Sequence, residues 1–466
     1  MTLAATSMAW MDQWFDEDAG LLWNPPGAFA EAAPTARRIH MIRETSWYAL
    51  GLVLRDGPSD AERAEVALRA IAAQQYNEPG TVWHGTFARF PESPRPRPGA
   101  VEWVDYDPNW RQFIGTALAL IRRHRPSTSP LVDAAIELAV DGEPPDRVGA
   151  WYSNIALMRA WLDAETGRAA QGEELAASVV ELFDRHGAFH EYNSPTYYGI
   201  DLFALGLWRS YPPTPAFAAW GDHLEAALWR DIGRYWHAGI GTGNLAGPYS
   251  RAYGMDMGAY AANLGLWLWD TLGPERAPFP DTATDFDHSH DFCKGPAVEL
   301  LGARIPDDTA PHFDAFQGER LVEQVITEQP SRVATAWLGE RAMVGGEAGD
   351  SGLHARGQFH PATVHWDAGD GRVGWVRAEH HGPTSATARP GELLIRCGPH
   401  PRRGPQPVTF HISCPGEERP LVSPTAWSLP GQTIAVRTEA SPVALEHGAV
   451  TIVRYGPTSE MVLCLA

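Results

Sequence analysis

The sequence is poor in lysine, in basic charge and in long hydrophobic runs. Of its 466 residues only Lys294 is a lysine, and Lys and Arg together number 37 against 57 Asp and Glu. The formal net charge of −20 argues against nucleic acid as the main partner, because phosphate binding requires a basic surface. No apolar run approaches the roughly 20 residues that a membrane-spanning helix needs. We therefore expect neither a nucleic-acid nor a membrane partner.

Cysteine is also scarce, which argues against a disulfide framework. The four cysteines are too few for a chain of this length and form no Cys-x-x-Cys pair. The first ten residues contain no basic residue, so the start does not resemble a secretory signal. Together these features predict a reduced, cytoplasmic protein.

Tryptophan, in contrast, is abundant and unevenly distributed. Fifteen of the 19 tryptophans precede residue 273 and four follow it. Large helical proteins use tryptophan for packing, and aromatic faces also stack on sugar rings. The count alone leaves both uses open.

Up to about residue 272 the apolar residues recur with helical spacing. In the segment 61–75, for example, Val66, Ala70 and Ile71 form one stripe opposite the charged residues. Breaks that contain Pro, Gly and Asp separate ten predicted helices. These helices cover 8–17, 36–55, 61–75, 109–124, 130–140, 149–165, 171–186, 200–210, 217–238 and 256–272. Their hairpin-like succession favours an incomplete α/α toroid over a plain helical bundle.

After about residue 285 short alternating runs bounded by Gly and Pro replace the helical pattern. Such runs are typical of antiparallel sandwich sheets. They lie at 362–366, 374–378, 393–396, 408–412, 433–437 and 450–454. The sequence thus predicts an α+β multidomain protein. An α/α toroid over 1–272 carries the active site, 273–300 forms a linker, and 301–466 forms an antiparallel β-sandwich.

The loop over 188–198, between two predicted helices, is the most informative stretch of the chain. A loop that only connects two helices would be richer in Gly, Ser, Asp and Lys. This loop instead offers His190, Glu191, Tyr192, Asn193, Thr196, Tyr197 and Tyr198. We interpret it as a catalytic loop; the alternative is a buried turn whose tyrosines pack.

Three other segments combine aromatic and polar residues near predicted helix starts. In a toroid these helix starts could meet at one open end, the toroid mouth. Individually they are ordinary helix-start sequences. They add Asn154, Arg251 and Tyr253 to the catalytic candidates. The predicted substrate-binding residues are Trp83, His84, Trp103, Tyr106, Asn109, Trp110, Arg111, Tyr152, Glu191 and Tyr249.

Two motifs resemble those of the α/α-toroid polysaccharide lyases of the alginate lyase and heparinase-like groups. The segment 186–205, HGAFHEYNSPTYYGIDLFAL, looks like their Asp-Gly-x-Phe turn followed by a catalytic tyrosine and an apolar helix, with His186 in the usual place of Asp. The segment 152–161, YSNIALMRAW, looks like their Asn-His-x-x-Trp-type helix, with Ile155 in place of His. The asparagine of that helix neutralises a substrate carboxylate. The resemblance implies a carbon–oxygen lyase that acts on a uronate-containing oligosaccharide or glycoside.

β-Elimination across C4–C5 of a uronate makes two chemical demands and requires no metal or other cofactor. An amide or guanidinium must bind the carboxylate and stabilise its developing charge. The candidates for this role are Asn193 and Asn154, aided by Arg251 or Arg111. A phenol or imidazole must take the C5 proton and return one to the leaving O4. The candidates for this second role are Tyr198 and Tyr197, with His190, His84 or Tyr253 as partners.

Other functions remain open. A glycoside hydrolase would need two carboxyl groups that flank the bond, and Asp105, Asp107, Glu191, Asp201 and Asp256 are candidates. A non-catalytic carbohydrate-binding protein would use the tryptophans, and a dehydratase would run the same elimination on another substrate. The histidines after residue 285 lack metal-ligand spacing, so we predict no metal site. The segment 352–360 would form a rim loop if the sheets pack beside the toroid mouth.

Overall fold

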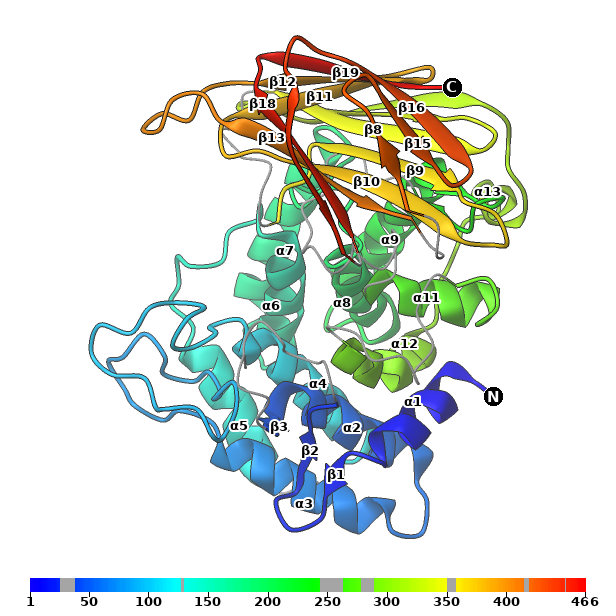
Figure 1. The fold of residues 1–466 in the computed structure, drawn as a ribbon. Helices are drawn as coiled ribbons and strands as arrows, with labels where there is room; N and C mark the ends of the chain where they lie inside the picture. Colours follow the sequence, from blue (N-terminus) through cyan, green and yellow to red (C-terminus); the bar gives the residue numbers. More distant parts are fainter. Residues whose placement is uncertain are drawn as a thin grey trace.

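The computed structural model describes residues 1–25, 38–126, 130–243, 263–277, 289–349, 358–414, 419–448 and 450–466. A helical N-terminal part is followed by stacked antiparallel sheets (Figure 1). The predicted fold class, an incomplete α/α toroid followed by an antiparallel sandwich, is confirmed. The helices are α1 (Leu3–Met11), α2 (Ile42–Arg55), α3 (Asp60–Ala73), α4 (Trp110–His124), α5 (Pro130–Asp141), α6 (Ser153–Glu165), α7 (Ala169–Asp184), α8 (Tyr198–Ser210), α9 (Pro215–Tyr235), α11 (Asn263–Leu272), the 3₁₀ helix η1 (Ser289–Lys294), α12 (Gly295–Leu301) and α13 (Ala310–Asp314).

The helices form hairpins whose first members pack side by side. Short connections join α2 to α3, α4 to α5, α6 to α7 and α8 to α9, and each pair packs together. Across hairpins, α2 packs on α4, α4 on α6, α6 on α8, and α8 on α11. This inner row is buried over most of its length, whereas α3 and α7 bury one stripe each. Because each outer helix returns the chain, the inner helices place their N-termini at the same end.

Close packing of α8 against α11 depends on glycine at position 199. A Cβ added at Gly199 would lie 2.4 Å from the carbonyl carbon of Asn263 and 2.5 Å from the backbone nitrogen of Leu264. The indole of Trp267 donates to the Gly199 carbonyl oxygen at 2.8 Å. A side chain at position 199 would therefore push the two helices apart.

We expect Gly199→Ala to lower the free energy of unfolding by about 1–3 kcal/mol, because backbone atoms of α11 cannot move aside as a side chain can. Gly206→Ala is the matched control in the same helix. Its Cβ would meet only side-chain atoms of Leu301, at 3.1 Å or more, and alanine favours helix. Urea unfolding of both variants checks this expectation, and equal losses of stability would contradict it.

The N-terminal segment differs from its predicted helix at 8–17. The helix α1 starts earlier, at Leu3, because the Thr2 side chain accepts from the backbone N–H of Ala5 and caps it. Three short strands follow, β1 (Phe15–Asp16), β2 (Leu21–Trp23) and β3 (His40–Met41), in one antiparallel sheet. Helices also continue beyond residue 272, since η1 and all but the last residue of α12 fall within 273–300, and α12 packs against α1, α2 and α8.

The C-terminal part consists mainly of two antiparallel sheets. The eight-stranded sheet has the order β17-β18-β13-β10-β9-β8-β7-β6, and the six-stranded sheet has the order β11-β12-β19-β16-β15-β14. All six predicted strand runs lie in strands of these sheets. The strands are β6 (Arg320–Glu328), β7 (Ser331–Leu338), β8 (Ala342–Gly349), β9 (Ala362–Asp367), β10 (Val373–Glu379), β11 (Thr384–Arg389), β12 (Glu392–Cys397), β13 (Pro407–Ser413), β14 (Leu421–Val422), β15 (Ala426–Leu429), β16 (Gln432–Arg437), β17 (Pro442–His447), β18 (Thr451–Pro457) and β19 (Glu460–Leu465); β4 (Trp236–His237) and β5 (Thr242–Gly243) pair separately.

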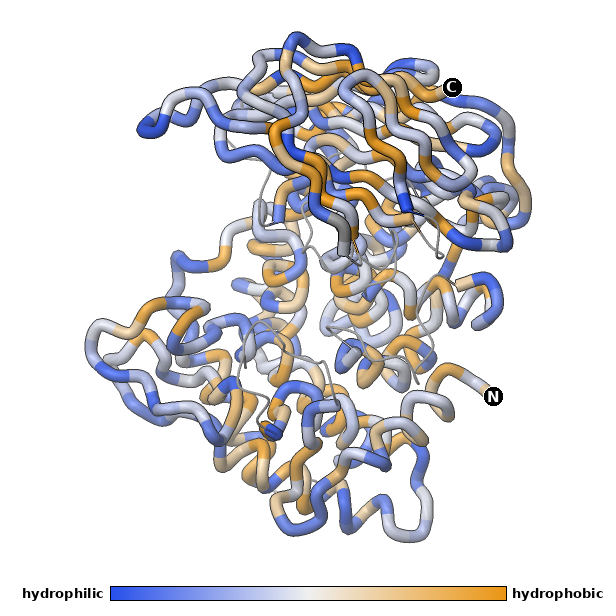
Figure 2. The backbone as a smooth tube through the Cα atoms, in the orientation of Figure 1, coloured by the Kyte–Doolittle hydropathy of each residue, from blue (hydrophilic) through white to orange (hydrophobic). Residues whose placement is uncertain are grey.

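The eight-stranded sheet has two buried faces. Alternate residues such as Val364 and Phe410 face the six-stranded sheet and form the sandwich core. On the opposite face, Leu338 and Met343 pack with Ala188 and Tyr192 of the helical part. Figure 2 shows apolar segments both along the helices and along the strands. The sheet therefore lies directly over the loop that precedes α8 (Figure 1).

None of the described helices combines the length and the apolar character that crossing a bilayer demands.

Candidate active site at the helix N-termini

The loop before α8 ties the N-terminus of α6 to that of α8. The Glu191 carboxylate accepts hydrogen bonds from the Ser153 hydroxyl (2.9 Å), the Asn154 backbone N–H (3.2 Å) and the Asn154 side-chain amide (2.6 Å). Asn193 adopts a left-handed conformation (φ 47°), which asparagine tolerates. The backbone N–H of Tyr197 then donates to the Ser194 hydroxyl at 3.1 Å, one residue before α8 begins. The loop thus brings several candidates from distant positions in the sequence together.

Two buried carboxyl groups lie at this junction. Glu191 is 6% exposed, and burial raises its pKa to about 7 despite the hydrogen bonds that it accepts. Asp201, in the first turn of α8, is fully buried, and neither of its oxygens has a hydrogen-bond partner among the described residues. Burial, and next the charge of Glu191, raise the pKa of Asp201 well above its ordinary value. The protonated form of Asp201 is therefore favoured, whereas Glu191 titrates near neutral pH.

A carboxyl group whose pKa is raised by folding makes the protein less stable as pH rises from its unfolded pKa to its folded pKa. For Glu191 that window runs from about pH 4.5 to about 7, and the full loss is about 3 kcal/mol. Glu191→Gln keeps an acceptor for Ser153 and Asn154 but does not titrate. We expect the variant to gain about 3 kcal/mol relative to the wild type between pH 4.5 and 7 in urea unfolding. A stability difference independent of pH would contradict this.

Tyr198 and Asn193, two leading catalytic candidates, lie in the protein interior. Tyr198 is 1% exposed and its hydroxyl donates to Asp231 of α9 at 2.9 Å. The same carboxylate accepts from the Tyr192 hydroxyl at 3.0 Å and forms an ion pair with Arg234. Tyr198 therefore anchors α8 to α9, and its phenol is already engaged.

Tyr197, the adjacent residue, has different surroundings. It is partly exposed, and its hydroxyl donates to the side-chain oxygen of Gln358, just before β9. The two parts of the protein therefore meet at this phenol. Gln358 belongs to the segment 352–360, predicted as a rim loop, of which residues 358–360 are described.

His190 is also partly exposed and lies beneath the sheet. Its backbone carbonyl accepts from Arg332 of β7 at 2.8 Å, and Arg332 also binds both oxygens of Glu347. Burial, and next the nearby charge of Arg332, lower the pKa of the His190 imidazole. Its neutral form, which can accept a proton, is therefore favoured.

Arg111, predicted to contact substrate, has a structural role instead. It is fully buried and donates to the backbone carbonyls of His84 (3.0 Å), Pro108 (3.2 Å) and Val82 (2.9 Å). Burial lowers its pKa to about 10. The guanidinium fastens the long loop 76–108 onto α4 and is unavailable to a ligand.

The other predicted substrate-binding residues include both buried and exposed side chains. Those that are buried are Trp83, Tyr106, Asn109 and Trp110. Trp103 is 52% exposed, and His84 and Tyr152 are partly exposed. The Tyr152 hydroxyl accepts from the Asn109 amide at 2.6 Å, and its ring stacks on the exposed ring of Trp151. Tyr249, Arg251, Tyr253 and Asp256 lie outside the described residues.

Some residues of the site were not found from the sequence. Asp231 lies three residues after Leu228 and four before Tyr235, which places an acidic residue on an apolar face of α9. This position is the signal in the sequence that identifies Asp231. The sequence around Gln358 contains no comparable signal.

Two further charged pairs lie in η1 and in the first turn of α2: Lys294 donates to Asp291 at 2.5 Å, and Arg43 binds Glu44. Within the described ranges, no three His, Cys, Asp or Glu side chains are placed to hold a metal ion.

Comparisons with known proteins give one family and a likeness in fold. A family model described as "Domain of unknown function (DUF8769)" matches residues 1–303. No curated protein matches the chain in sequence. The solved structure of heparinase III is similar, with 9% identity, a TM-score of 0.42, and coverage of 91% of this chain and 76% of that one. A mutant of the heparan sulfate lyase HepC from Pedobacter heparinus has a TM-score of 0.31 at the same identity and coverage.

Proposed function

Because this chain belongs to the DUF8769 family, whose function is unknown, its activity must be inferred from its own site, and we propose a carbon–oxygen lyase. It acts by β-elimination on a uronate-containing oligosaccharide or glycoside. The observation that supports this most is the position of Tyr197, whose partly exposed phenol lies beside the joined N-terminal ends of α6 and α8.

Tyr197 is the acid–base group of this proposal. In the elimination the C5–H bond breaks, C4=C5 forms, C4–O4 breaks, and the proton passes to the leaving O4. The hydrogen bond to Gln358 holds the phenol at the junction of the two parts, where a substrate hydroxyl or ring oxygen can replace the neutral amide. His190, with its lowered pKa, is a neutral imidazole that can share the proton.

In this proposal the substrate carboxylate binds at the N-terminal end of α6, where Asn154 is 1% exposed and its amide must turn away from Glu191 to reach the substrate. The charge of Glu191 acts in turn on the buried Asp201. Both carry raised pKa values, so the protonated forms do not repel an acidic substrate. A protonated carboxyl group also donates a hydrogen bond, as an amide does, to a developing negative charge.

The same two carboxyl groups argue against a glycoside hydrolase. That chemistry needs one protonated and one ionised carboxyl group at the bond. Glu191, with a pKa of about 7, suits the acid, but burial disfavours the ionised form of Asp201 as well. The remaining described candidates, Asp105 and Asp107, belong to the long loop 76–108, and Asp107 accepts from the backbone N–H of Asn109.

Incubation with a panel of uronate glycans tests the proposal. An elimination creates a conjugated unsaturated uronate, so ultraviolet absorbance and reducing ends should rise together. The matched control is the same glycan with its carboxyl groups reduced to alcohols, which should give neither signal. Reducing ends without absorbance would indicate a hydrolase, and binding without either signal would indicate a carbohydrate-binding protein; both outcomes contradict a lyase.

A further inference from the structure

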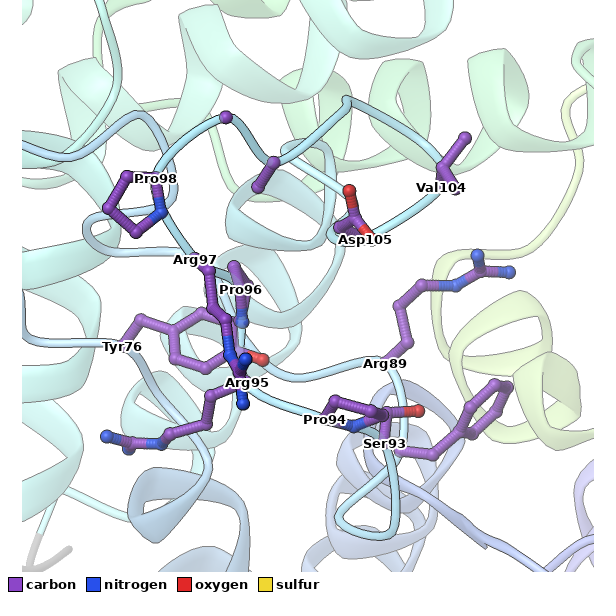
Figure 3. Close-up of a pocket in the computed structure, with 13 residues that line it drawn as sticks. Tyr76, Arg89, Ser93, Pro94, Arg95, Pro96, Arg97, Pro98, Val104 and Asp105 are labelled. Atoms are coloured by element: carbon purple, nitrogen blue, oxygen red, sulfur yellow. The ribbon is translucent and has the colours of Figure 1, made fainter.

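A pocket of about 470 Å³ opens in the loop between α3 and α4, within the usual range of small-molecule sites, about 300–1,000 Å³. This loop projects from the helical part at the left of Figure 1. The pocket walls carry Arg89, Arg95 and Arg97 together with Tyr76 and Asp105 (Figure 3). Three guanidinium groups around one cavity are unusual in a chain whose net charge is −20.

The backbone that presents these arginines is rigid. Residues 93–99 read Ser-Pro-Arg-Pro-Arg-Pro-Gly, so proline precedes and follows both Arg95 and Arg97. Proline fixes φ and reduces the number of backbone conformations. A ligand would therefore find both side chains on a largely preformed wall, which lowers the entropic cost of binding.

The charges of the pocket are only partly neutralised. Arg97 forms no side-chain hydrogen bond or ion pair with the part of the chain that the structure describes. Arg95 is 71% exposed and has a long contact to Glu78 at 3.4 Å. Asp105 uses one oxygen to accept from the backbone N–H of Val101 at 2.7 Å. Arg95 and Arg97 lie on the Tyr76 side, and the Asp105 carboxylate faces them from across the cavity (Figure 3).

We infer that this pocket binds an acidic sugar unit of the glycan, at a distance from the reacting unit; the inference rests on the proposed function. Guanidinium groups suit a carboxylate or sulfate. The other oxygen of Asp105 can accept from sugar hydroxyls, and the exposed Pro94 and Pro98 offer apolar faces to a pyranose.

Exposed aromatic rings lie on the loop that forms the pocket and just before α6. Arg89 donates to the backbone carbonyl of Trp103, whose side chain is 52% exposed. The same loop continues to Asn109, which binds Tyr152, and Tyr152 stacks on the 58% exposed Trp151 just before α6. Both exposed rings are suited to stack on sugar units of an extended glycan.

The test compares the full chain with the double variant Arg95→Gln/Arg97→Gln. The probes are reducing-end-labelled oligosaccharides of alginate, of unsulfated heparosan and of heparan sulfate, with cellohexaose as the uncharged control. We expect the double variant to bind at least one acidic probe about five- to tenfold more weakly, the loss expected for two exposed charge contacts. The matched control is Arg69→Gln, which removes an exposed arginine of α3 that contacts Glu65. It should bind as the wild type does.

The outcomes separate this inference from the proposed function. On a cleaved probe the double variant should raise KM and leave kcat unchanged, because the pocket is remote from the reacting bond. Weaker binding by the double variant without any cleavage by the wild type supports the pocket and contradicts the lyase. Cleavage with unchanged affinity and KM, or no binding of any acidic probe by the wild type, overturns the pocket. A preference for heparan sulfate over heparosan identifies sulfate as the bound group, and equal affinity identifies the carboxylate.

Discussion

Tyr197→Phe is expected to lower kcat on a uronate glycan by about 10²- to 10³-fold, with little change in KM. The substitution removes only the hydroxyl that exchanges protons with C5 and O4, and positioned acid–base groups contribute factors of this size. The ring remains, so contacts that position the substrate remain as well. The initial rate of rise in ultraviolet absorbance gives kcat and KM directly.

Tyr198→Phe is the matched control, at the next residue, where α8 begins. Its hydroxyl bonds Asp231 in the interior, so its loss should lower the free energy of unfolding by about 1–2 kcal/mol and leave kcat within about threefold. If Tyr198→Phe abolished turnover and Tyr197→Phe did not, the assignment of the acid–base group to Tyr197 would be wrong.

Asp231→Ala should lower the free energy of unfolding by about 2–4 kcal/mol, because the buried hydroxyls of Tyr192 and Tyr198 each lose a hydrogen bond to a charged acceptor. The carboxylate is 4% exposed and also binds Arg234, whose side chain is 37% exposed and can be solvated when the carboxylate is removed. Tyr192 keeps its hydrogen bond with Tyr235. Urea unfolding monitored by circular dichroism measures the loss.

Asp308→Ala provides the surface counterpart, since Asp308 also pairs with an arginine of α9, Arg230, but both side chains are exposed. It should leave the unfolding midpoint unchanged. Combining Asp231→Ala with Tyr198→Phe should cost less than the sum of the single losses, because both remove the same hydrogen bond. Additive losses, or a small effect of Asp231→Ala alone, would show that this network does not hold α8 to α9.

The sequence by itself determined the fold class and supplied the residues from which the candidate site is argued. Apolar residues repeat every three to four positions in helices and every second position in strands, and this pattern is local. The helices from α3 to α9 therefore lie within four residues of their predicted bounds. The helix predicted at 36–55 starts only at Ile42, because His40 and Met41 pair with β2 as the strand β3. The composition of the loop 188–198 marked Glu191 and Tyr197, and the start of α6 marked Asn154.

Only the tertiary structure decided which neighbouring side chain is buried and which is exposed. Successive residues of a helix point about 100° apart, so Tyr197 and Tyr198 are equivalent in composition and opposite in environment. Which direction is interior depends on where α9 and the eight-stranded sheet lie, and those contacts join residues far apart in sequence. For the same reason Arg111 looked like a ligand-binding arginine, although the carbonyls of a returning loop occupy its guanidinium.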